Sequence, residues 1–514
     1  MLELLLQGLG TTLAWAPLAA IIGGIVLGIM VGAMPGLSPS MGVALLVPFT
    51  YGMSPMLALI LLVAIYIGAS YGGSITAITI NAPGTGSAVV TSFDGYPLTQ
   101  QGRAATALGV SIVVSTIAGI IGTFVLIFFS VPLAAAAVRF HPAEYFAIAA
   151  FGLATISTLA GVEWRKAFVA AMLGLLINSV GTDPISGAER FTFNITPLSD
   201  GFMLIPALIG LFALSEVFTG IEQRNFKVAR LEGVGAAWPR FRDYWALKFV
   251  TVRSSIIGTL IGIFPGAGAI IASYISYDLS RRLSKEPEKY GQGSVEGVAA
   301  AEGANSGSVG GAMVPLLTLG IPGSATTAVL IGAMMIHRLT PGPQLFISNP
   351  SLIYGIFAAM LLSNVVLLII GLAGSRLWIK VTVVPKKVLF TLITMMVVVG
   401  AYAVRNSMFD VLCAFGFGIL GWILKRYKYP VAPVILGMVL GSIAETNFRR
   451  AIMMDGGTVF FTRPLSVIIL ALALLSFVVP LLGLRKEKLR QPPAAGEAKH
   501  DSGDDRSSGP SGQP

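Results

Sequence analysis

Gly32-Ala-Met-Pro-Gly36 recurs in the second half of the chain as Gly262-Ile-Phe-Pro-Gly266, the two prolines lying 230 positions apart. Both stretches adjoin long apolar segments, and proline and glycine interrupt helices. Backbone groups freed by such a break inside a membrane must find partners in the protein or in a water-filled cavity. The duplicated break therefore predicts two halves that are built on one plan.

A second pair of motifs follows the first in each half. Gly68-x3-Gly72-x10-Pro83-Gly84 recurs as Gly307-x3-Gly311-x10-Pro322-Gly323, at an offset of 239 positions. Paired interruptions in corresponding places of two halves are the best sequence pointer to the binding site of a transporter. We predict two structural repeats that are inverted, as is common in secondary transporters, although a parallel arrangement also fits the motifs.

The composition places the chain in a membrane. Of its 514 residues, 55% are hydrophobic and 11% are charged, whereas about 25% are charged in a typical soluble domain. Helices are the spanning structure that the long apolar runs support, because a membrane β-barrel shows short alternating segments instead. We predict an all-α polytopic membrane protein with about 10–13 transmembrane helices plus re-entrant hairpins. Short apolar pieces at 40–50, 75–91 and 266–277 are the expected half-helices or re-entrant arms.

The charge distribution indicates topology and domain organisation. The net charge is +10, and the basic residues cluster at the ends of apolar runs. This pattern is typical of topology control at a lipid surface, and it argues against a nucleic-acid partner. We predict a first transmembrane repeat at 1–221, a basic cytoplasmic linker at 222–250, a second repeat at 251–484 and a disordered polar tail at 485–514.

The interrupted segments supply groups that suit an organic carboxylate. A helix that begins after a Pro-Gly turn exposes backbone N–H groups, which favour anions, and small hydroxyl and amide side chains add further donors. The predicted substrate-binding residues are Ser38, Ser40, Asn81, Pro83, Gly84, Thr85, Asn305, Pro322, Gly323 and Ser324. The alternative for a single motif is a proline kink or small-residue packing between helices, but duplication favours a site.

The same breaks also expose carbonyl oxygens, which suit a small hard cation. Glu302 joins this set because an ionisable side chain at membrane depth is costly and is a functional candidate by default. The predicted ion-coupling residues are Gly32, Pro35, Gly36, Gly262, Pro265, Gly266, Gly268 and Glu302. Asp94-Gly-Tyr-Pro97 predicts a turn, in which the aspartate is a cap residue or a functional group.

Several chemistries have no support in the sequence. Gly84-x-Gly86 lacks the Lys-Ser/Thr of a nucleotide-binding loop, and neither His-Glu-x-x-His nor Gly-x-Ser-x-Gly occurs. The single Cys413 excludes an internal disulfide, and the three histidines are scattered. We predict a protein that is not an enzyme, with no cofactor or resident metal, powered by an ion gradient or by another subunit. A gated anion channel built from paired re-entrant loops is the alternative.

These motifs together resemble a known family. Gly32-Ala-Met-Pro-Gly-Leu37, Asn81-Ala-Pro-Gly-Thr85, Gly262-Ile-Phe-Pro-Gly-Ala-Gly268 and Glu296-Gly-Val-Ala-Ala-Ala-Glu302 are similar to motifs of the large membrane subunit of the bacterial tripartite tricarboxylate transporters. The resemblance covers about residues 15–480. The chain departs from the family pattern at Ser306, where a second asparagine is usual.

The resemblance implies a multi-pass permease in the bacterial inner membrane that imports a tricarboxylate or a related dicarboxylate. It also implies a periplasmic substrate-binding protein and a small four-helix membrane subunit as partners, with membrane lipid around the chain. Uptake is then driven by sodium or proton symport.

Overall fold

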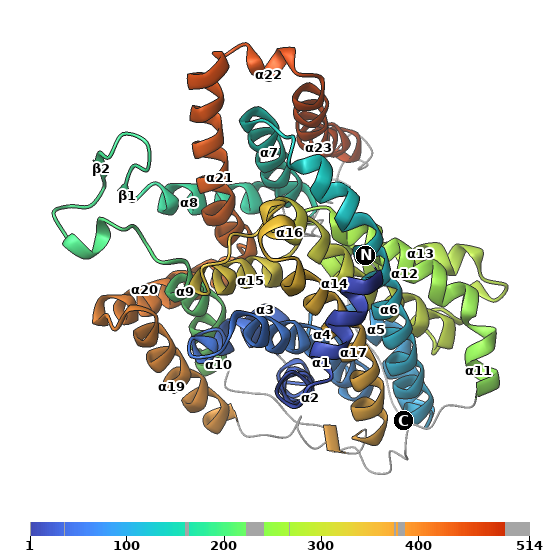
Figure 1. Ribbon diagram of the computed structural model, residues 1–514. Coiled ribbons are helices and arrows are strands. Elements are labelled where there is room, and N and C mark those ends of the chain that lie inside the picture. The colour runs from blue at the N-terminus through green and yellow to red at the C-terminus, as the bar shows by residue number, and fades with distance from the viewer. Residues whose placement is uncertain are drawn as a thin grey trace, which may run out of the picture.

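The computed structural model describes residues 2–34, 36–159, 164–222, 241–266, 268–374, 377–378 and 386–488. Almost all of its regular structure is helical, and one two-stranded ribbon projects at the edge of the molecule (Figure 1). The elements are α1 (Leu2–Thr12), α2 (Trp15–Gly32), α3 (Pro39–Leu46), α4 (Pro55–Ile80), α5 (Ala88–Gln100), α6 (Ala104–Ala137), α7 (Pro142–Leu159), α8 (Trp164–Asn178), β1 (Gly181–Thr182), β2 (Glu189–Arg190), α9 (Leu204–Leu208), α10 (Ser215–Glu222), α11 (Phe241–Ala246), α12 (Lys248–Ile263), α13 (Gly268–Leu283), α14 (Val295–Leu319), α15 (Ala325–Ile336), α16 (Gln344–Ser348), α17 (Pro350–Ala373), α19 (Lys386–Arg405), α20 (Met408–Arg426), α21 (Ala432–Asp455), α22 (Val459–Thr462) and α23 (Pro464–Lys488).

Within the described residues, seven helices are long and apolar enough to cross a membrane, which confirms the all-α polytopic fold. These candidate spans are Trp15–Gly32, Pro55–Ile80, Ala104–Ala137, Leu204–Glu222, Pro350–Ala373, Val388–Arg405 and Met408–Arg426. The span Leu204–Glu222 is continuous although it contains a π-helical segment, η3 (Ile209–Leu214), between α9 and α10. Several other helices are shorter or carry polar residues, so length and composition alone do not select them.

Two helix pairs with matching contacts form the centre of the fold. Glycines bring α2 against α4: a Cβ atom on Gly28 would lie 2.5 Å from the Ile65 carbonyl oxygen, and one on Gly68 would lie 2.7 Å from that of Ile25. In the second half, α12 packs against α14 in the same way, with a Cβ on Gly262 placed 2.6 Å from the Ser308 carbonyl oxygen. Small residues therefore let the backbones touch, as in other packed membrane helices.

The long helices of the two pairs run antiparallel to each other. Asn305 Nδ2 donates to the Ser70 carbonyl oxygen (3.1 Å), and Ser74 Oγ donates to Glu302 (2.6 Å). From Ser70 to Ser74 the residue number rises along α4, whereas that of the partner on α14 falls from Asn305 to Glu302, so the two helices run in opposite directions. Helix α6 packs against α4, α14 and α17, and α17 packs against α4 as well. These two flanking helices complete a central bundle (Figure 1).

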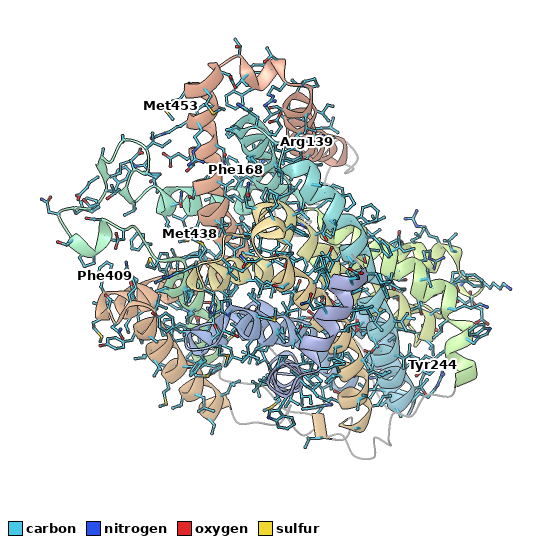
Figure 2. The ribbon with its side chains drawn as sticks, viewed as in Figure 1. Arg139, Phe168, Tyr244, Phe409, Met438 and Met453 are labelled. Carbon is cyan, nitrogen blue, oxygen red and sulfur yellow. The ribbon has the colours of Figure 1, made fainter. Side chains whose placement is uncertain are left out.

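Two lobes flank this bundle, and each combines segments from both halves of the chain. The first lobe contains α7 and α8 together with α21, α22 and α23. The second lobe contains α9, η3 and α10 together with α19 and α20. Figure 2 shows Phe168 and Met438 in the first lobe, where α8 meets α21, and Phe409 in the second. The halves are therefore interlocked rather than separate.

Two expectations from the sequence are corrected here, for 75–91 and 94–97, and the structure of the predicted piece at 266–277 is described after them. The segment 75–91 is not a separate re-entrant arm, because its first part continues α4 without interruption to Ile80. Asp94–Pro97 is not a turn but lies inside α5, which accommodates Pro97 near its end. The piece at 266–277 forms the first part of α13, whose last turn carries Arg281 and Arg282.

Some predicted features lie outside the described residues. Pro35 is one of them, as are 223–240 of the predicted linker and 489–514 of the predicted tail. The remainder of the linker forms α11 and the start of α12.

The loop between α8 and α9 is anchored by one buried carboxylate. Asp183 accepts hydrogen bonds from the backbone N–H groups of Ser186 (3.0 Å) and Ile185 (2.8 Å), and it pairs with Arg449 of α21 (2.5 Å). These backbone bonds, followed by the Arg449 guanidinium, hold the pKa of Asp183 well below its usual range. The loop therefore has a fixed conformation over the end of α21.

We predict a pH-dependent loss of stability in Asp183→Asn. Because the folded-state pKa of Asp183 is depressed, its ionised form stabilises the folded protein above an unfolded-state pKa of about 3.9, and this contribution falls as pH decreases below that value. The thermal midpoint of the variant in detergent should lie below that of the parent at pH 7, and the gap should narrow toward pH 3. Asp200→Asn, whose side chain is 77% exposed, is the control; a gap that stays constant with pH would contradict the assignment.

Candidate functional site

The first Pro-Gly tip folds back along the helix that precedes it. Asn81 ends α4 in the left-handed conformation (φ 52°), and Ala82 N–H donates to the Thr76 carbonyl oxygen (3.2 Å). Asparagine tolerates this conformation because its short polar side chain reduces the penalty. The chain then reverses, so that Gly84 N–H donates to the Gly73 carbonyl oxygen (3.2 Å). Asn81 is thus a cap with an exposed side chain.

This tip lies directly against the first helix break. A Cβ atom on Gly84 would collide with the carbonyl oxygen of Gly32, the last residue of α2. The predicted site residues Gly32 and Gly84 are therefore brought together by backbone contact. The turn that follows uses Gly36 at φ +93°, a conformation that L-residues with side chains rarely adopt.

The second half repeats this arrangement position by position. Gly320 ends α14 in the left-handed conformation (φ 71°), and Ile321 N–H donates to the Pro315 carbonyl oxygen (3.2 Å), at the offset of 239 from the first copy. A Cβ on Gly323 would lie 3.1 Å from the Gly262 carbonyl oxygen, and Gly266 N–H donates to the Gly323 carbonyl oxygen (3.3 Å). The second tip therefore closes on the second break as the first tip does on the first.

The helices that follow the first break and the second tip are capped by hydroxyl groups. Ser38 Oγ accepts from Met41 N–H (3.3 Å) at the start of α3, and it bonds with Ser40 Oγ (2.8 Å). Ser324 and Thr327 form a reciprocal capping box at the start of α15. In the first tip, Thr85 Oγ1 accepts from Ala88 N–H (3.3 Å). Each hydroxyl satisfies one terminal N–H and leaves others of the first turn available for an anion. Gly268 begins α13 at φ +58° with open space beside it.

The two tips contact the central helix α4 at different levels. The first tip reaches Gly73 through Gly84, whereas Ser324 Oγ of the second tip bonds with the Tyr66 hydroxyl (3.3 Å). The two contact points are seven residues apart on α4, which corresponds to about 10 Å of helix rise. The two tips therefore contact α4 at different heights along its axis, one at Gly73 and the other at Tyr66, and not at one point.

Glu302 occupies a fully buried cage of hydroxyl groups near the first tip. Its carboxylate accepts hydrogen bonds from Ser74 Oγ (2.6 Å), Thr91 Oγ1 and Ser115 Oγ (3.0 Å). These donors belong to three different helices, α4, α5 and α6, and none of them was identified from the sequence. Among the described residues, no salt bridge involves Glu302. A buried carboxylate held only by neutral donors is costly, so this cage is suited to take up a cation or a proton.

Asn305 lies one helical turn beyond Glu302 on α14. Its Nδ2 atom donates to the Ser70 carbonyl oxygen, and its buried Oδ1 atom has no hydrogen-bond partner within the described part of the chain. The sequence correctly indicated that Glu302 and Asn305 share one face of a helix. The structure adds that this face points at α4.

Each break also contacts one of the two lobes. A Cβ on Gly36 would lie 2.7 Å from Glu216 Oε1 of α10, and Glu216 pairs with Lys425 of α20 (2.5 Å). At the other break, Thr155 Oγ1 of α7 donates to the Pro265 carbonyl oxygen (2.8 Å). Glu216 follows the π-helical segment η3, a type of irregularity that is frequent at functional sites. A movement of either lobe would therefore act on the break that it touches.

Asp94 is a structural hub that connects the two halves. Its Oδ1 atom accepts from the backbone N–H groups of Gly291 (2.8 Å), Gly293 (3.0 Å) and Ser294 (2.8 Å), and its Oδ2 atom accepts from the Tyr277 hydroxyl (2.7 Å). The carboxylate thereby attaches α5, which follows the first tip, to the loop that leads into α14. The structure gives Asp94 the role of an anchor between the two halves, which the sequence analysis did not propose.

Comparison with known proteins agrees with this arrangement of motifs. A sequence model of the tripartite tricarboxylate transporter TctA family matches residues 18–436. An uncharacterized 52.8 kDa protein of the TAR-I ttuC' 3' region of Agrobacterium vitis is 38% identical over 442 residues, which cover 86% of this chain and 88% of the relative. A second protein, of the TAR-II ttuC' 3' region of the same organism, is 39% identical over 236 residues, which cover 46% of this chain and 98% of the relative. No solved structure matches the chain.

We predict that Asp94→Ala destabilises the fold by about 3 kcal/mol or more, because it leaves three backbone N–H groups without an acceptor, at about 1–3 kcal/mol each. The stability of Asp94→Asn, which keeps one acceptor oxygen, should lie between that of the parent protein and that of Asp94→Ala. Denaturant unfolding of the purified protein measures the difference. Asp278→Ala on α13, whose side chain is 58% exposed, should change stability by less than about 1 kcal/mol. Equal effects of Asp94→Ala and Asp278→Ala would contradict the anchoring role.

Proposed function

The chain belongs to the tripartite tricarboxylate transporter TctA family, and from this we propose that it is the permease subunit of a binding-protein-dependent secondary transporter. In this proposal it imports a tricarboxylate or a related dicarboxylate across the bacterial inner membrane by sodium or proton symport. A periplasmic substrate-binding protein delivers the carboxylate, and a small four-helix membrane subunit completes the complex.

The observation that carries this proposal is the pair of tip-and-break units. In each unit a glycine of the tip touches the carbonyl of the helix break, Gly84 against Gly32 and Gly323 against Gly262. The antiparallel course of α4 and α14 supports an inverted relation between the halves. In this proposal, the two oppositely directed units provide equivalent routes from the two membrane faces, as inverted repeats do in many alternating-access transporters.

The substrate carboxylates bind, in this proposal, at the N-terminal turns that follow the tips and the first break. Thr85 precedes α5, Ser324 caps α15 and Ser38 caps α3. Backbone N–H groups of these first turns carry partial positive charge toward an anion, and the neighbouring hydroxyls add donors of adjustable direction. Within the described residues, the tips contain no lysine or arginine, so the anion would be held by dipoles and its charge neutralised by co-transported cations.

Glu302 is the proposed coupling group of the first unit. Its hydroxyl cage includes Thr91 of α5, which follows the first tip directly, so cation uptake at Glu302 would act on the helix that positions the substrate. The corresponding position in the first half, 239 residues earlier, is Val63. The ionisable group is therefore present in only one of the two units.

The gated anion channel remains the alternative to this proposal. A channel needs a continuous polar path, whereas the tips are packed against α2 and α12 by backbone contact. This packing favours a site that opens and closes. Saturable uptake that requires the binding protein distinguishes a transporter from a channel.

The test is uptake of labelled citrate and a panel of dicarboxylates into proteoliposomes that contain this chain, its small membrane partner and the binding protein. Sodium and proton gradients are imposed separately. The proposal predicts saturable uptake that needs the binding protein and one of the two gradients. Uptake that ignores both gradients would overturn the symport mechanism and favour the channel.

We predict that Glu302→Gln uncouples transport from the driving ion. The amide keeps the size of the side chain but removes the charge that would bind the cation, so gradient-driven uptake should fall by at least about tenfold, equivalent to about 1.4 kcal/mol. Substrate counterflow without a gradient should persist. The control is Glu296→Gln on the same helix. Glu296 lies in the first turn of α14 and accepts hydrogen bonds from the Ser284 and Tyr290 hydroxyls (2.6 and 3.2 Å). Intact gradient dependence in Glu302→Gln would exclude this residue as the coupling group.

A further inference from the structure

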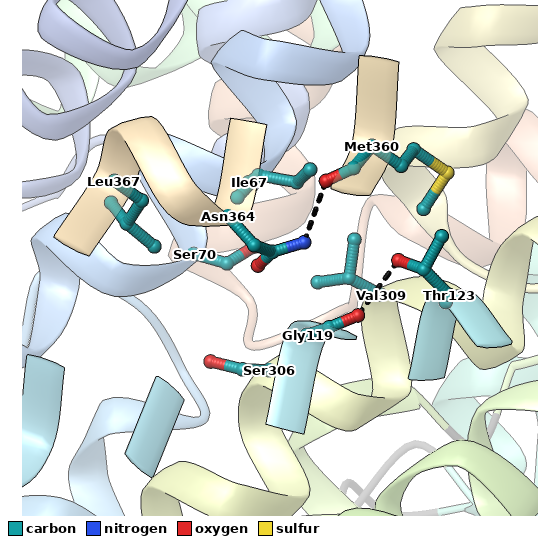
Figure 3. A pocket seen from close by; sticks show the side chains of 10 residues that line it. Ile67, Ser70, Gly119, Thr123, Ser306, Val309, Met360, Asn364 and Leu367 are labelled. Atoms are coloured by element: carbon teal, nitrogen blue, oxygen red, sulfur yellow. Dashed lines mark hydrogen bonds between the residues drawn. The ribbon is translucent and has the colours of Figure 1, made fainter. Parts of the chain in front are cut away.

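A small cavity of mixed polar and apolar lining lies in the centre of the bundle, about one helical turn along α14 from Glu302. Its walls come from α4, α6, α14 and α17, and Figure 3 shows its polar groups around a narrow space. The lining residues are Ile67, Ser70, Gly119, Thr123, Ser306, Val309, Gly310, Met360, Asn364 and Leu367. The space holds about one water-sized particle, far too little for a tricarboxylate.

The cavity coincides with the point where the two halves are related to each other. Ile67 and Ser306 are 239 positions apart, and so are Ser70 and Val309, so two matched pairs of positions line the same space. The matched positions carry different residues: Ser70 corresponds to Val309, and Ser306 corresponds to Ile67. The first tip contacts α4 at Gly73, on one side of this level, and the second contacts it at Tyr66, on the other.

Two hydroxyl groups of the cavity and one amide hydrogen of Asn364 donate to backbone carbonyl oxygens. Ser70 Oγ donates to the Tyr66 carbonyl oxygen (2.8 Å) and Thr123 Oγ1 to that of Gly119 (2.7 Å). Asn364 is 2% exposed, and its Nδ2 atom donates to the Met360 carbonyl oxygen (2.8 Å; Figure 3). Its Oδ1 atom, directed toward Gly119, has no hydrogen-bond partner among the described residues.

Four side-chain oxygens line this space, those of Ser70, Thr123, Ser306 and Asn364, and such a set suits a cation. A water molecule has two hydrogen atoms to donate, and a cation can be coordinated by all the oxygens at once. The cavity has no carboxylate, which disfavours a divalent ion, and no titratable side chain, which excludes a proton. Its size favours a small monovalent ion.

We propose that this cavity is a sodium site, with Ser70, Thr123, Ser306 and Asn364 as its side-chain ligands. The proposal deepens the proposed symport and rests on it, because it makes sodium the coupling ion. An ion at this level would draw together α4 and α14, the helices that end in the two tips. It would also join α6 and α17 to them, so that occupancy favours one packing of the bundle.

The test is direct binding of ²²Na⁺ to the full-length chain purified in detergent, with unlabelled Na⁺, Li⁺, K⁺ and choline as competitors. Wild type should bind sodium saturably, with Na⁺ competing better than K⁺. Ser70→Ala should raise the half-saturating sodium concentration by at least about tenfold, since each 1.4 kcal/mol of lost binding is a factor of ten. Asn364→Ala should have the larger effect because it removes a buried amide oxygen that has no hydrogen-bond partner among the described residues.

Ser363→Ala is the matched control. Ser363 precedes Asn364 on α17, is fully buried and does not line the cavity, so its removal should leave sodium affinity unchanged. Thermal midpoints in choline show whether each variant is folded, and Ser306→Ala replaces Asn364→Ala if the latter is not.

Absence of saturable sodium binding to the wild type would overturn the proposal. Unchanged sodium affinity in Ser70→Ala together with Asn364→Ala or Ser306→Ala would also overturn it, and would mean that water occupies the cavity. Uptake separates this result from the proposed function. If the variants bind sodium as the wild type does and uptake is sodium-driven, the cavity site is excluded and the symport proposal stands. If the variants lose sodium binding but wild-type uptake is independent of both gradients, the symport proposal is excluded and the cavity site stands.

Discussion

The structure depends on one contact that is made twice, between a Pro-Gly tip and the carbonyl end of a broken helix. Proline and glycine free backbone groups in a low-dielectric interior, where each unsatisfied group is costly. The tip at Gly84 covers the carbonyl of Gly32, and the tip at Gly323 covers that of Gly262. A Cβ atom at Gly84 would meet the break itself, whereas one at Gly32, Gly262 or Gly323 would meet the backbone of the long helix packed beside it, so close backbone packing requires glycine at all four positions. Each tip therefore packs directly against a break, and in the second unit a hydrogen bond from Gly266 N–H to the Gly323 carbonyl oxygen joins the two.

The two units match in backbone and differ in the side chains that carry chemistry. The left-handed caps at Asn81 and Gly320 and their hydrogen bonds correspond at one constant offset. Glu302 has Val63 as its counterpart, and the central cavity has serine on one side of each matched pair. A symmetric scaffold thus supports an asymmetric set of polar groups. A coupled transporter needs such a difference, because the ion and the substrate must bind to distinct groups although the two routes of access are alike.

The lobes give this scaffold a second level of organisation. Each is assembled from helices of both halves, and each touches one break, through Glu216 at Gly36 and through Thr155 at Pro265. The bundle that carries the tips is therefore held between two bodies that contact it at corresponding points. Conformational coupling in such an arrangement requires packed elements with two discrete arrangements, and the glycine-rich helix pairs permit sliding of that kind.

The sequence by itself determined the class of fold, the two pairs of motifs and the family. Composition and apolar length predict membrane helices because the bilayer leaves few alternatives, and the Pro-Gly motifs are visible because helix interruption is a local property. The same local reasoning treated 75–91 as a separate arm and 94–97 as a turn, since it had no access to the contacts that extend α4 and α5. Only the tertiary structure decided which tip covers which break, that Ser74, Thr91 and Ser115 surround Glu302, and that Asn364 faces a cavity with Ser70 and Ser306. These groups come from helices that are distant in the chain, and hydroxyls and amides are common in membrane helices, so their convergence is a property of packing that no local pattern encodes.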